Sequence, residues 1–168
     1  MSVDLSSSVA CAAHHSEVVN APYSVVWRLL EEKVFLPTMH VPGVTAVTIV
    51  KDEGPTVGVE RRMTHAVKGE IHELITYSSA VDPATARHRG LVTFKMLSDA
   101  ILEGEVLNEA FELEDGSTRV AYTMNWHYQP QVPADARKPP FPDGGAGAIA
   151  GAVRHMKAAA EEASKESA

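Results

Sequence analysis

The chain of 168 residues has one cysteine, Cys11, and no long hydrophobic run. A single cysteine cannot form an internal disulfide, which is typical of proteins from a reducing compartment. No stretch approaches the roughly 18 apolar residues of a transmembrane helix. The first 13 residues lack the basic start and apolar core of a secretory signal. We therefore expect a cytoplasmic protein that does not insert into a membrane.

Basic residues are also few. The chain has 15 Lys and Arg against 22 Asp and Glu, a formal net charge of −7, and the basic residues form no stripe or cluster. Nucleic acids are therefore not expected as partners. The eight histidines show no metal-ligand spacing, so we expect no metal. Phosphate-binding glycine loops, the dinucleotide fingerprint and the Gly-x-Ser-x-Gly motif are absent, and no cofactor is expected.

The length and composition of the chain indicate one globular domain. With 45% hydrophobic and 22% charged residues, the composition is ordinary for a folded chain that can bury a core. We expect a flexible N-terminal tail over residues 1–13 and a single domain over residues 14–165. No repeat or domain-splitting linker interrupts that domain, and we expect a monomer or a weak homodimer.

The apolar pattern predicts a strand, two helices and then six more strands. The strand His14–Asn20 precedes a helix with Pro22 in its first turn, where the missing N–H costs nothing. This helix would bury an apolar stripe and end in the solvated residues 31–33. A second short helix lies before Val44, broken at Pro42. Residues that alternate with a period of two follow in Thr45–Lys51, Gly58–Ala66, Glu70–Ser78, Arg87–Leu97, Ile101–Leu113 and Thr118–Tyr128.

Two hairpins set the expected register. Val67-Lys68-Gly69 is typical of a three-residue loop with a left-handed glycine, which pairs Ala66 with Glu70. Arg61 and Glu73 then become diagonal neighbours on the inner face of the sheet.

Asp115-Gly116 predicts the second hairpin, with Leu113 opposite Thr118 and Glu109 opposite Tyr122. Glu109 would therefore point inward. A bulge near Val106 would change this register upstream.

The C-terminal segment predicts a long but thin helix from Gly144 to Lys165, which follows a proline-rich connector. Its length would be about 33 Å. Its inward residues, Ile149, Val153, Met156 and Ala160, are too few and small to fill the concave face of a sheet that carries large aromatic side chains. A hollow between helix and sheet is the consequence, and a small molecule would occupy it.

Several local features have the order of a known family. They are the segment Val18–Trp27 (VVNAPYSVVW), Val41–Val44 (VPGV), Val57-Gly58, Gly69–Glu73 (GEIHE), Asp82-Pro83 and Asp115–Val120 (DGSTRV). From Ser16 to Ala163 the chain resembles the START-like, Bet v 1-like superfamily, also called the polyketide cyclase/dehydrase and lipid transport superfamily (SRPBCC).

The resemblance implies an α+β helix-grip fold. A curved seven-stranded antiparallel sheet would surround the long C-terminal helix, with two short helices after the first strand. Members of the superfamily hold hydrophobic molecules between sheet and helix; some carry lipids, some bind quinones, and some cyclise or dehydrate polyketides. The fold does not choose among these activities.

The inner-face residues supply candidate chemistry. Arg61 with Glu73 would anchor a ligand carbonyl or carboxylate, or form a structural ion pair. Glu109 with Tyr122 would place a carboxyl group and a phenol for proton transfer, or satisfy each other. The predicted ligand-binding set is Arg61, Met63, His65, Glu73, Tyr77, Phe94, Tyr122, Met124, Trp126, Tyr128, Ile149, Val153 and Met156. The catalytic candidates are Arg61, Glu73, Glu109 and Tyr122.

Two functions remain open from the sequence. The first is non-enzymatic binding of a small hydrophobic or aromatic molecule in the internal cavity. The second is a cofactor-free cyclase, dehydratase or isomerase that uses the same cavity and acts on a polyketide-like or aromatic substrate.

Overall fold

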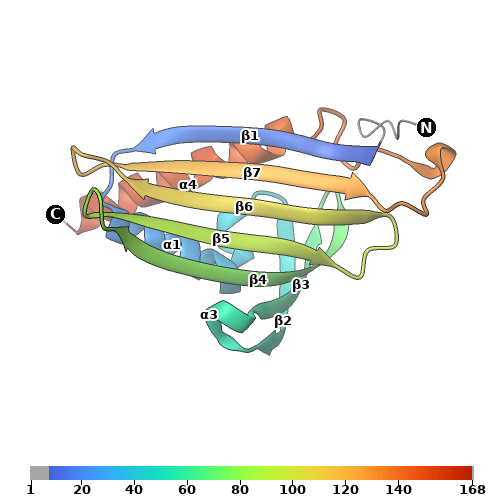
Figure 1. Cartoon of the computed structure of the whole chain (residues 1–168), viewed down its shortest axis with the longest axis horizontal. Coiled ribbons are helices and arrows are strands. Elements are labelled where there is room, and N and C mark those ends of the chain that lie inside the picture. Colours follow the sequence, from blue (N-terminus) through green and yellow to red (C-terminus); the bar gives the residue numbers. More distant parts are fainter. Residues whose placement is uncertain (1–7, 168) are drawn as a thin grey trace.

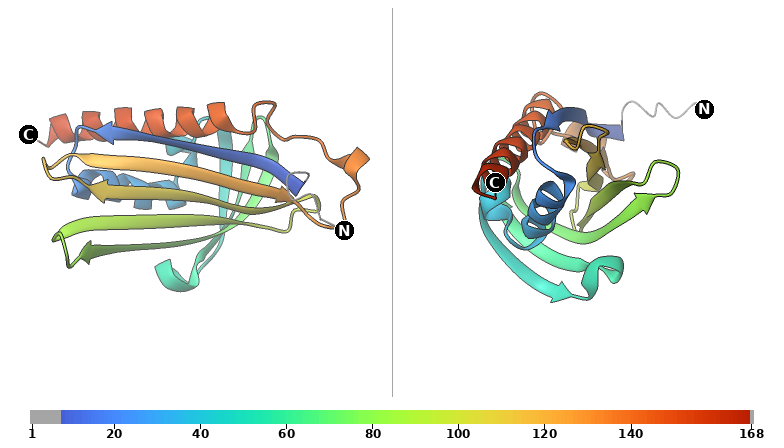
Figure 2. Two further views of the ribbon diagram at one scale, coloured as in Figure 1. Left: turned by 45° about the horizontal axis from the view of Figure 1, so that its top comes forward. Right: turned by 90° about the vertical axis from the view of Figure 1, so that its left-hand side faces the viewer.

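A computed structural model describes residues 8–167 and shows seven antiparallel strands in the order β1-β7-β6-β5-β4-β3-β2. The sheet curves around α1 and α4, which lie on its concave side (Figure 1; Figure 2). This is the expected α+β helix-grip architecture. The strands are β1 (Val9–Val19), β2 (Val44–Asp52), β3 (Val59–His65), β4 (Gly69–Asp82), β5 (Arg87–Leu97), β6 (Leu102–Glu112) and β7 (Thr118–Tyr128). The helices are α1 (Tyr23–Phe35), α2 (Pro37–His40), α3 (Gly54–Val57), the 3-10 turn η2 (Ala134–Ala136) and α4 (Ala146–Glu166).

The first strand begins earlier than expected. Residues 9–13, predicted to belong to the flexible tail, pair with β7, and Val9 lies opposite His127. Cys11 is therefore buried, and burial raises the pKa of its thiol to about 11. The rest of the predicted tail, residues 1–7, lies outside the described residues.

The β3–β4 hairpin has the predicted faces but a register shifted by two residues. Arg61 lies directly opposite Glu73, and His65 lies opposite Gly69. Gly69 keeps the predicted left-handed backbone, with φ +86°. The turn closes earlier because the His65 ring Nδ1 accepts the backbone N–H groups of Val67 and Lys68. A shift of two residues keeps every side chain on its face, so the inner-face prediction still holds.

The β6–β7 hairpin corrects the prediction for Glu109. The loop has three residues, with the Leu113 N–H donating to the Ser117 carbonyl and Gly116 at φ +84°. The Asp115 carboxylate stabilises this turn by accepting from the Ser117 N–H and hydroxyl. The register changes by one residue, so Asn108, and not Glu109, lies opposite Tyr122. A shift of one residue moves every β6 side chain to the other face.

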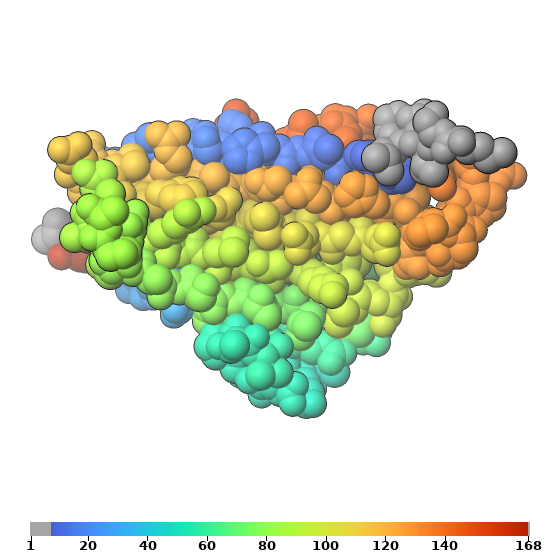
Figure 3. Space-filling model, viewed as in Figure 1, coloured from blue at the N-terminus to red at the C-terminus, as the bar shows by residue number. Residues whose placement is uncertain are grey.

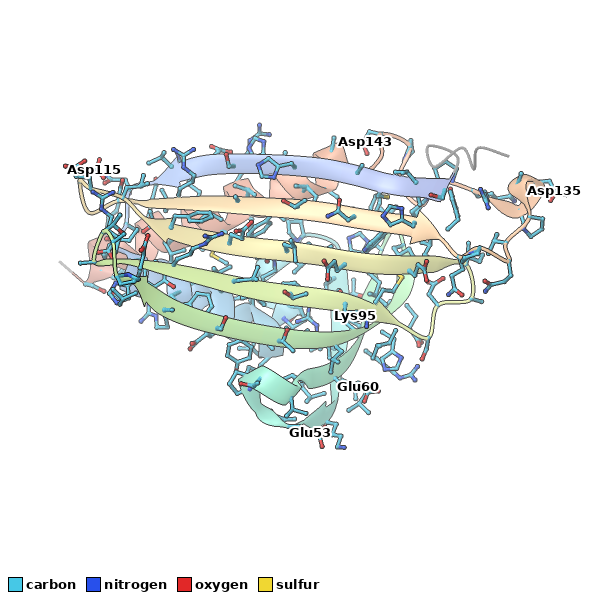
Figure 4. The ribbon with its side chains drawn as sticks, in the orientation of Figure 1. Glu53, Glu60, Lys95, Asp115, Asp135 and Asp143 are labelled. Carbon is cyan, nitrogen blue, oxygen red and sulfur yellow. The ribbon has the colours of Figure 1, made fainter. Side chains whose placement is uncertain are left out.

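Figure 3 shows the outer face of the sheet, where the coloured bands of β1, β7, β6, β5 and β4 follow one another from top to bottom, above the segment of β2 and α3. Charged side chains lie on this face and on the turns. Lys95 is exposed on β5, whereas Asp115 and Asp135 mark turns at opposite ends of the molecule (Figure 4). The apolar groups are concentrated on the concave side, where α1 and α4 cover them.

Among the helices of the described residues, none is long and apolar enough to cross a bilayer. Within residues 8–167, no group of three or more His, Cys, Asp or Glu side chains is arranged to hold a metal ion.

Candidate functional site

A cavity of about 90 Å³ lies between the concave face of the sheet and the first turns of α4. The sequence predicted a hollow at this place because the side chains of the C-terminal helix are small. Two of its alanines, Ala148 and Ala152, form part of the cavity wall. Most of the lining is apolar, and the polar groups come from α1, β3, β4, β6 and β7. The lining residues are Lys33, Val41, Pro42, Arg61, Met63, His65, Ile71, Glu73, Phe94, Val106, Asn108, Tyr122, Met124, Trp126, Phe141, Ala148, Ile149 and Ala152.

Lys33 and Asn108 are the two polar lining residues that the sequence analysis missed. Lys33 was expected in the solvated end of the first helix, but its side chain is only 5% exposed. Lys33 follows Leu29 by four residues and Leu30 by three, so it continues the buried stripe of α1. The helical spacing was therefore the signal, and the charge of the side chain concealed it.

The Lys33 ammonium is held by one hydrogen bond and two aromatic rings. Its Nζ donates to Asn108 Oδ1 at 2.5 Å. The same atom lies 4.2 Å from the centroid of the Tyr122 ring and 5.2 Å from that of Phe94. Burial lowers the pKa of Lys33 to about 7, and the positive charge of Arg61 adds to this effect. Glu73 opposes the shift, but no carboxylate in residues 8–167 forms an ion pair with Lys33.

Arg61 joins the sheet to the end of α1. Its Nε and Nη2 atoms each lie 3.0 Å from Glu73 Oε2. Its Nη1 donates to the Lys33 and Val34 carbonyls, at 2.8 Å and 2.7 Å. Carbonyls in the last turn of a helix have no partner within the helix, so Arg61 acts as the C-terminal cap of α1. The hydrogen bonds of Nε and Nη1 use three of the five N–H donors of the guanidinium, and Nη2 forms the ion pair with Glu73.

Next to Lys33 lie two buried polar atoms that have no hydrogen-bond partner among the described residues. They are the hydroxyl of Tyr122 and the Nδ2 of Asn108, on side chains that are 1% and 0% exposed. Burial also raises the pKa of Tyr122, so its hydroxyl stays protonated. Unpaired buried polar groups are uncommon in folded proteins because each loses its hydration. The site therefore has spare donors facing a cavity.

Two loop segments also contribute to the wall of the cavity. Val41 and Pro42 come from the segment after α2, and Phe141 comes from the proline-rich connector. The Phe141 ring packs against His65 and Trp126, with centroid distances of 5.9 and 6.0 Å. Burial lowers the pKa of His65.

Nine of the predicted ligand-binding residues line the cavity. They are Arg61, Met63, His65, Glu73, Phe94, Tyr122, Met124, Trp126 and Ile149. The other four lie elsewhere. Val153 and Met156 are fully buried in the core under α4, Tyr128 is buried below the guanidinium of Arg137, and half-buried Tyr77 lies near Pro55.

The predicted pairing of Glu109 with Tyr122 is wrong. Glu109 points away from the cavity, and its carboxylate lies 3.4 Å from the Arg89 guanidinium. The three-residue turn at Asp115 placed Asn108 on the inner face instead, so the polar neighbour of Tyr122 is an amide. The alternation along β6 was compatible with Val106, Asn108 and Ala110 facing inward. The length of the loop decided which face of β6 points into the cavity.

Three comparisons place the fold among known proteins. No family model matches the chain, and no curated protein matches its sequence. Among solved structures, the chain is similar to the human StarD13 (DLC2) lipid transfer and protein localization domain, with a TM-score of 0.61 and 12% identity over 88% of this chain and 75% of that one. A START superfamily protein from Mycobacterium smegmatis gives a TM-score of 0.57 and 12% identity, covering 94% of this chain and 99% of that one. For Ara h 8.0201 the values are 0.52 and 17%, over 92% and 97% of the two chains.

These similarities show that the chain has the START-like, Bet v 1-like fold that its motifs resembled. At sequence identities of 12 to 17%, these similarities support the fold but not a shared function. The chemistry of the site must therefore be argued from its own residues.

The first prediction concerns Arg61. Arg61→Met should destabilise the protein by about 3 to 5 kcal/mol, because it leaves the Glu73 carboxylate buried without a partner and the last carbonyls of α1 uncapped. The double variant Arg61→Met/Glu73→Met should recover much of this loss. Urea denaturation of both variants measures the difference, and a single variant as stable as the wild type would contradict the structural role.

The second prediction follows from the lowered pKa of Lys33. Between about pH 7 and the ordinary lysine value of 10.5, the unfolded chain holds a proton that the folded chain has released. Stability therefore rises with pH in this window, by at most about 1.4 kcal/mol per unit, and levels off below it. Lys33→Met should lack this rise. Denaturation of both proteins at a series of pH values isolates the contribution of Lys33, and equal slopes would show that its pKa is not lowered.

Proposed function

We propose that the protein binds a small hydrophobic or aromatic molecule that carries one polar group, in the cavity between the sheet and α4. One observation carries the proposal: most of the cavity wall is apolar, and Lys33, Asn108 and Tyr122 meet at it with hydrogen-bond donors that have no partner among the described residues. Binding sites for small molecules commonly combine an apolar lining with a few placed polar groups. The apolar wall would hold the body of the ligand, and the polar end would orient it.

The size of the cavity favours a small ligand over a lipid. The similar human domain is described as a lipid transfer domain, and a lipid is the natural alternative occupant. At about 90 Å³ the cavity is smaller than the roughly 150 Å³ of an engineered cavity that holds benzene. A long acyl chain would need the wall formed by Phe141 and α4 to move apart.

Native mass spectrometry of the purified protein tests the proposal directly. We expect a bound molecule of low mass that is released by mild activation and is chemically unchanged. Recovery of the protein with no bound molecule, together with no binding of any apolar dye, would reject the proposal.

A third prediction uses two alanines of α4. Ala152 lines the cavity, whereas Ala160 is fully buried in the core and does not line it. Ala152→Leu should fill the cavity and weaken the binding of an apolar dye while stability is kept or raised. Ala160→Leu should instead overpack the core and cost about 1 to 3 kcal/mol. Dye titration and thermal melts separate the two effects. Unchanged dye binding by Ala152→Leu would place the ligand elsewhere.

A cofactor-free cyclase, dehydratase or isomerase is the second candidate. The pKa of Lys33, lowered to about 7, favours it because a proton carrier works best when its pKa is near the operating pH. The neutral Lys33 amine would remove a proton from the carbon next to a substrate carbonyl. The Tyr122 hydroxyl would then donate a hydrogen bond to the enolate oxygen, and the Lys33 ammonium would return the proton at a new position.

The fourth prediction distinguishes this enzyme from a binding protein. For an enzyme, Lys33→Met and Tyr122→Phe should lower the turnover of enolisable β-dicarbonyl compounds far more than they change affinity, by about a hundredfold or more for Lys33. Glu109→Gln is the matched control, since Glu109 lies outside the cavity. Mass spectrometry of the incubated compounds gives the readout. If the wild type leaves all of them unchanged, the enzymatic candidate is rejected.

A further inference from the structure

The polar end of the cavity has an excess of hydrogen-bond donors. When protonated, Lys33 carries three N–H donors, and only one of them has a partner, Asn108 Oδ1. The Nδ2 of Asn108 and the hydroxyl of Tyr122 have no partner at all in the described part of the chain. The elements hold these groups together, because Asn108 and Tyr122 are direct neighbours across β6 and β7 while Lys33 reaches them from α1.

The charges at this end of the cavity do not balance either. Five titratable side chains line the cavity: Lys33 on α1, Arg61 and His65 on β3, Glu73 on β4 and Tyr122 on β7. The uncharged amide of Asn108 joins them from β6. Glu73 neutralises Arg61 through two contacts of 3.0 Å to one carboxylate oxygen. From β5 and α4 the cavity receives only apolar side chains. A protonated Lys33 is therefore a buried cation without a counterion, which is costly in a low-dielectric site.

We propose that the ligand is a small monocarboxylate with an apolar body, whose carboxylate accepts from Lys33, Asn108 and Tyr122. Its two oxygens offer about four acceptor sites, enough for most of the spare donors: two on the Lys33 ammonium, two on Asn108 Nδ2 and one on Tyr122. Its negative charge supplies the missing counterion and forms charge-assisted hydrogen bonds. The apolar body then lies against the aromatic and aliphatic wall. This inference rests on the proposed function, since it names the ligand class of the same cavity.

Binding of a carboxylate is expected to change the protonation state of Lys33. In the ligand-free protein, burial lowers the pKa of Lys33 to about 7, so the amine is largely neutral at higher pH. A carboxylate beside it favours the ammonium, so binding above this pH takes up a proton. The affinity for a carboxylate should then fall by up to about tenfold for each pH unit above the free value. His65 does not interfere in this range, because burial lowers its pKa from an ordinary value of 6.5.

The test compares carboxylates with neutral molecules of the same shape. Propionate and isobutyrate, which are smaller than benzoate, are titrated by calorimetry beside propionamide and isobutyramide, at about pH 7 and about pH 9. We expect each acid to bind the wild type at least about tenfold more tightly than its amide at the lower pH. At the higher pH this preference should shrink by about tenfold or more, while amide binding stays constant.

Three variants complete the experiment. Lys33→Met keeps the apolar stem and should abolish the preference at both pH values, and thermal melts show that it folds. Tyr122→Phe should reduce the preference several-fold by removing one donor. Lys51→Met is the matched control, because the Lys51 side chain is 61% exposed and does not line the cavity, and it should behave as the wild type.

The possible failures are distinguishable. Amides that bind as tightly as the acids, or a preference that survives in Lys33→Met, would overturn the carboxylate inference and leave the proposed binding function in place. If neither acids nor amides bind and no apolar dye enters the wild type, both the binding function and the carboxylate inference fail.

Discussion

The buried contact between Arg61 and the end of α1 is the constraint on which the site depends. Arg61 is 1% exposed and would be costly to bury alone, so it needs both the Glu73 carboxylate and the last carbonyls of the helix. These bonds fix where α1 ends against the sheet. Because Lys33 occupies the last turn of that helix, the same contact places its ammonium over the rings of Tyr122 and Phe94.

The two buried cations, Arg61 and Lys33, have different roles in this arrangement. Arg61 is nearly saturated with hydrogen bonds and is paired with Glu73, so its role is to hold the walls together. Lys33 has a single hydrogen bond and no carboxylate partner among the described residues, and it faces the cavity. Lys33 is therefore a better anchor than Arg61, because an anionic ligand would neutralise its charge and so offset the cost of burying that charge. The sequence analysis had left both roles open for Arg61 and had not considered Lys33 as an anchor.

The thin C-terminal helix sets the size of the site. Val153, Met156 and Ala160 are fully buried and close the core along much of α4. Only its first turns, with Ala148, Ile149 and Ala152, leave space against the sheet. Phe141 from the connector fills part of that space by packing against Trp126. The cavity is therefore confined to one end of the helix, next to the polar groups, and this favours a small ligand.

The sequence by itself determined the order of the seven strands, α1, α2 and α4, but not the short α3 and η2. It also determined the inner faces of β3, β4 and β7 and the buried stripe of α4, because these follow from local periodicity and turn residues. Only the tertiary structure decided the polar site. The partner of Tyr122 depended on the turn at Asp115, where a loop of two or three residues exchanges Glu109 for Asn108. Burial of Lys33 depended on Arg61, 28 residues away, capping its helix against the sheet. The helical spacing of Lys33 and the alternation along β6 are compatible with both placements, but the loop length and the packing of α1 against β3 decided them.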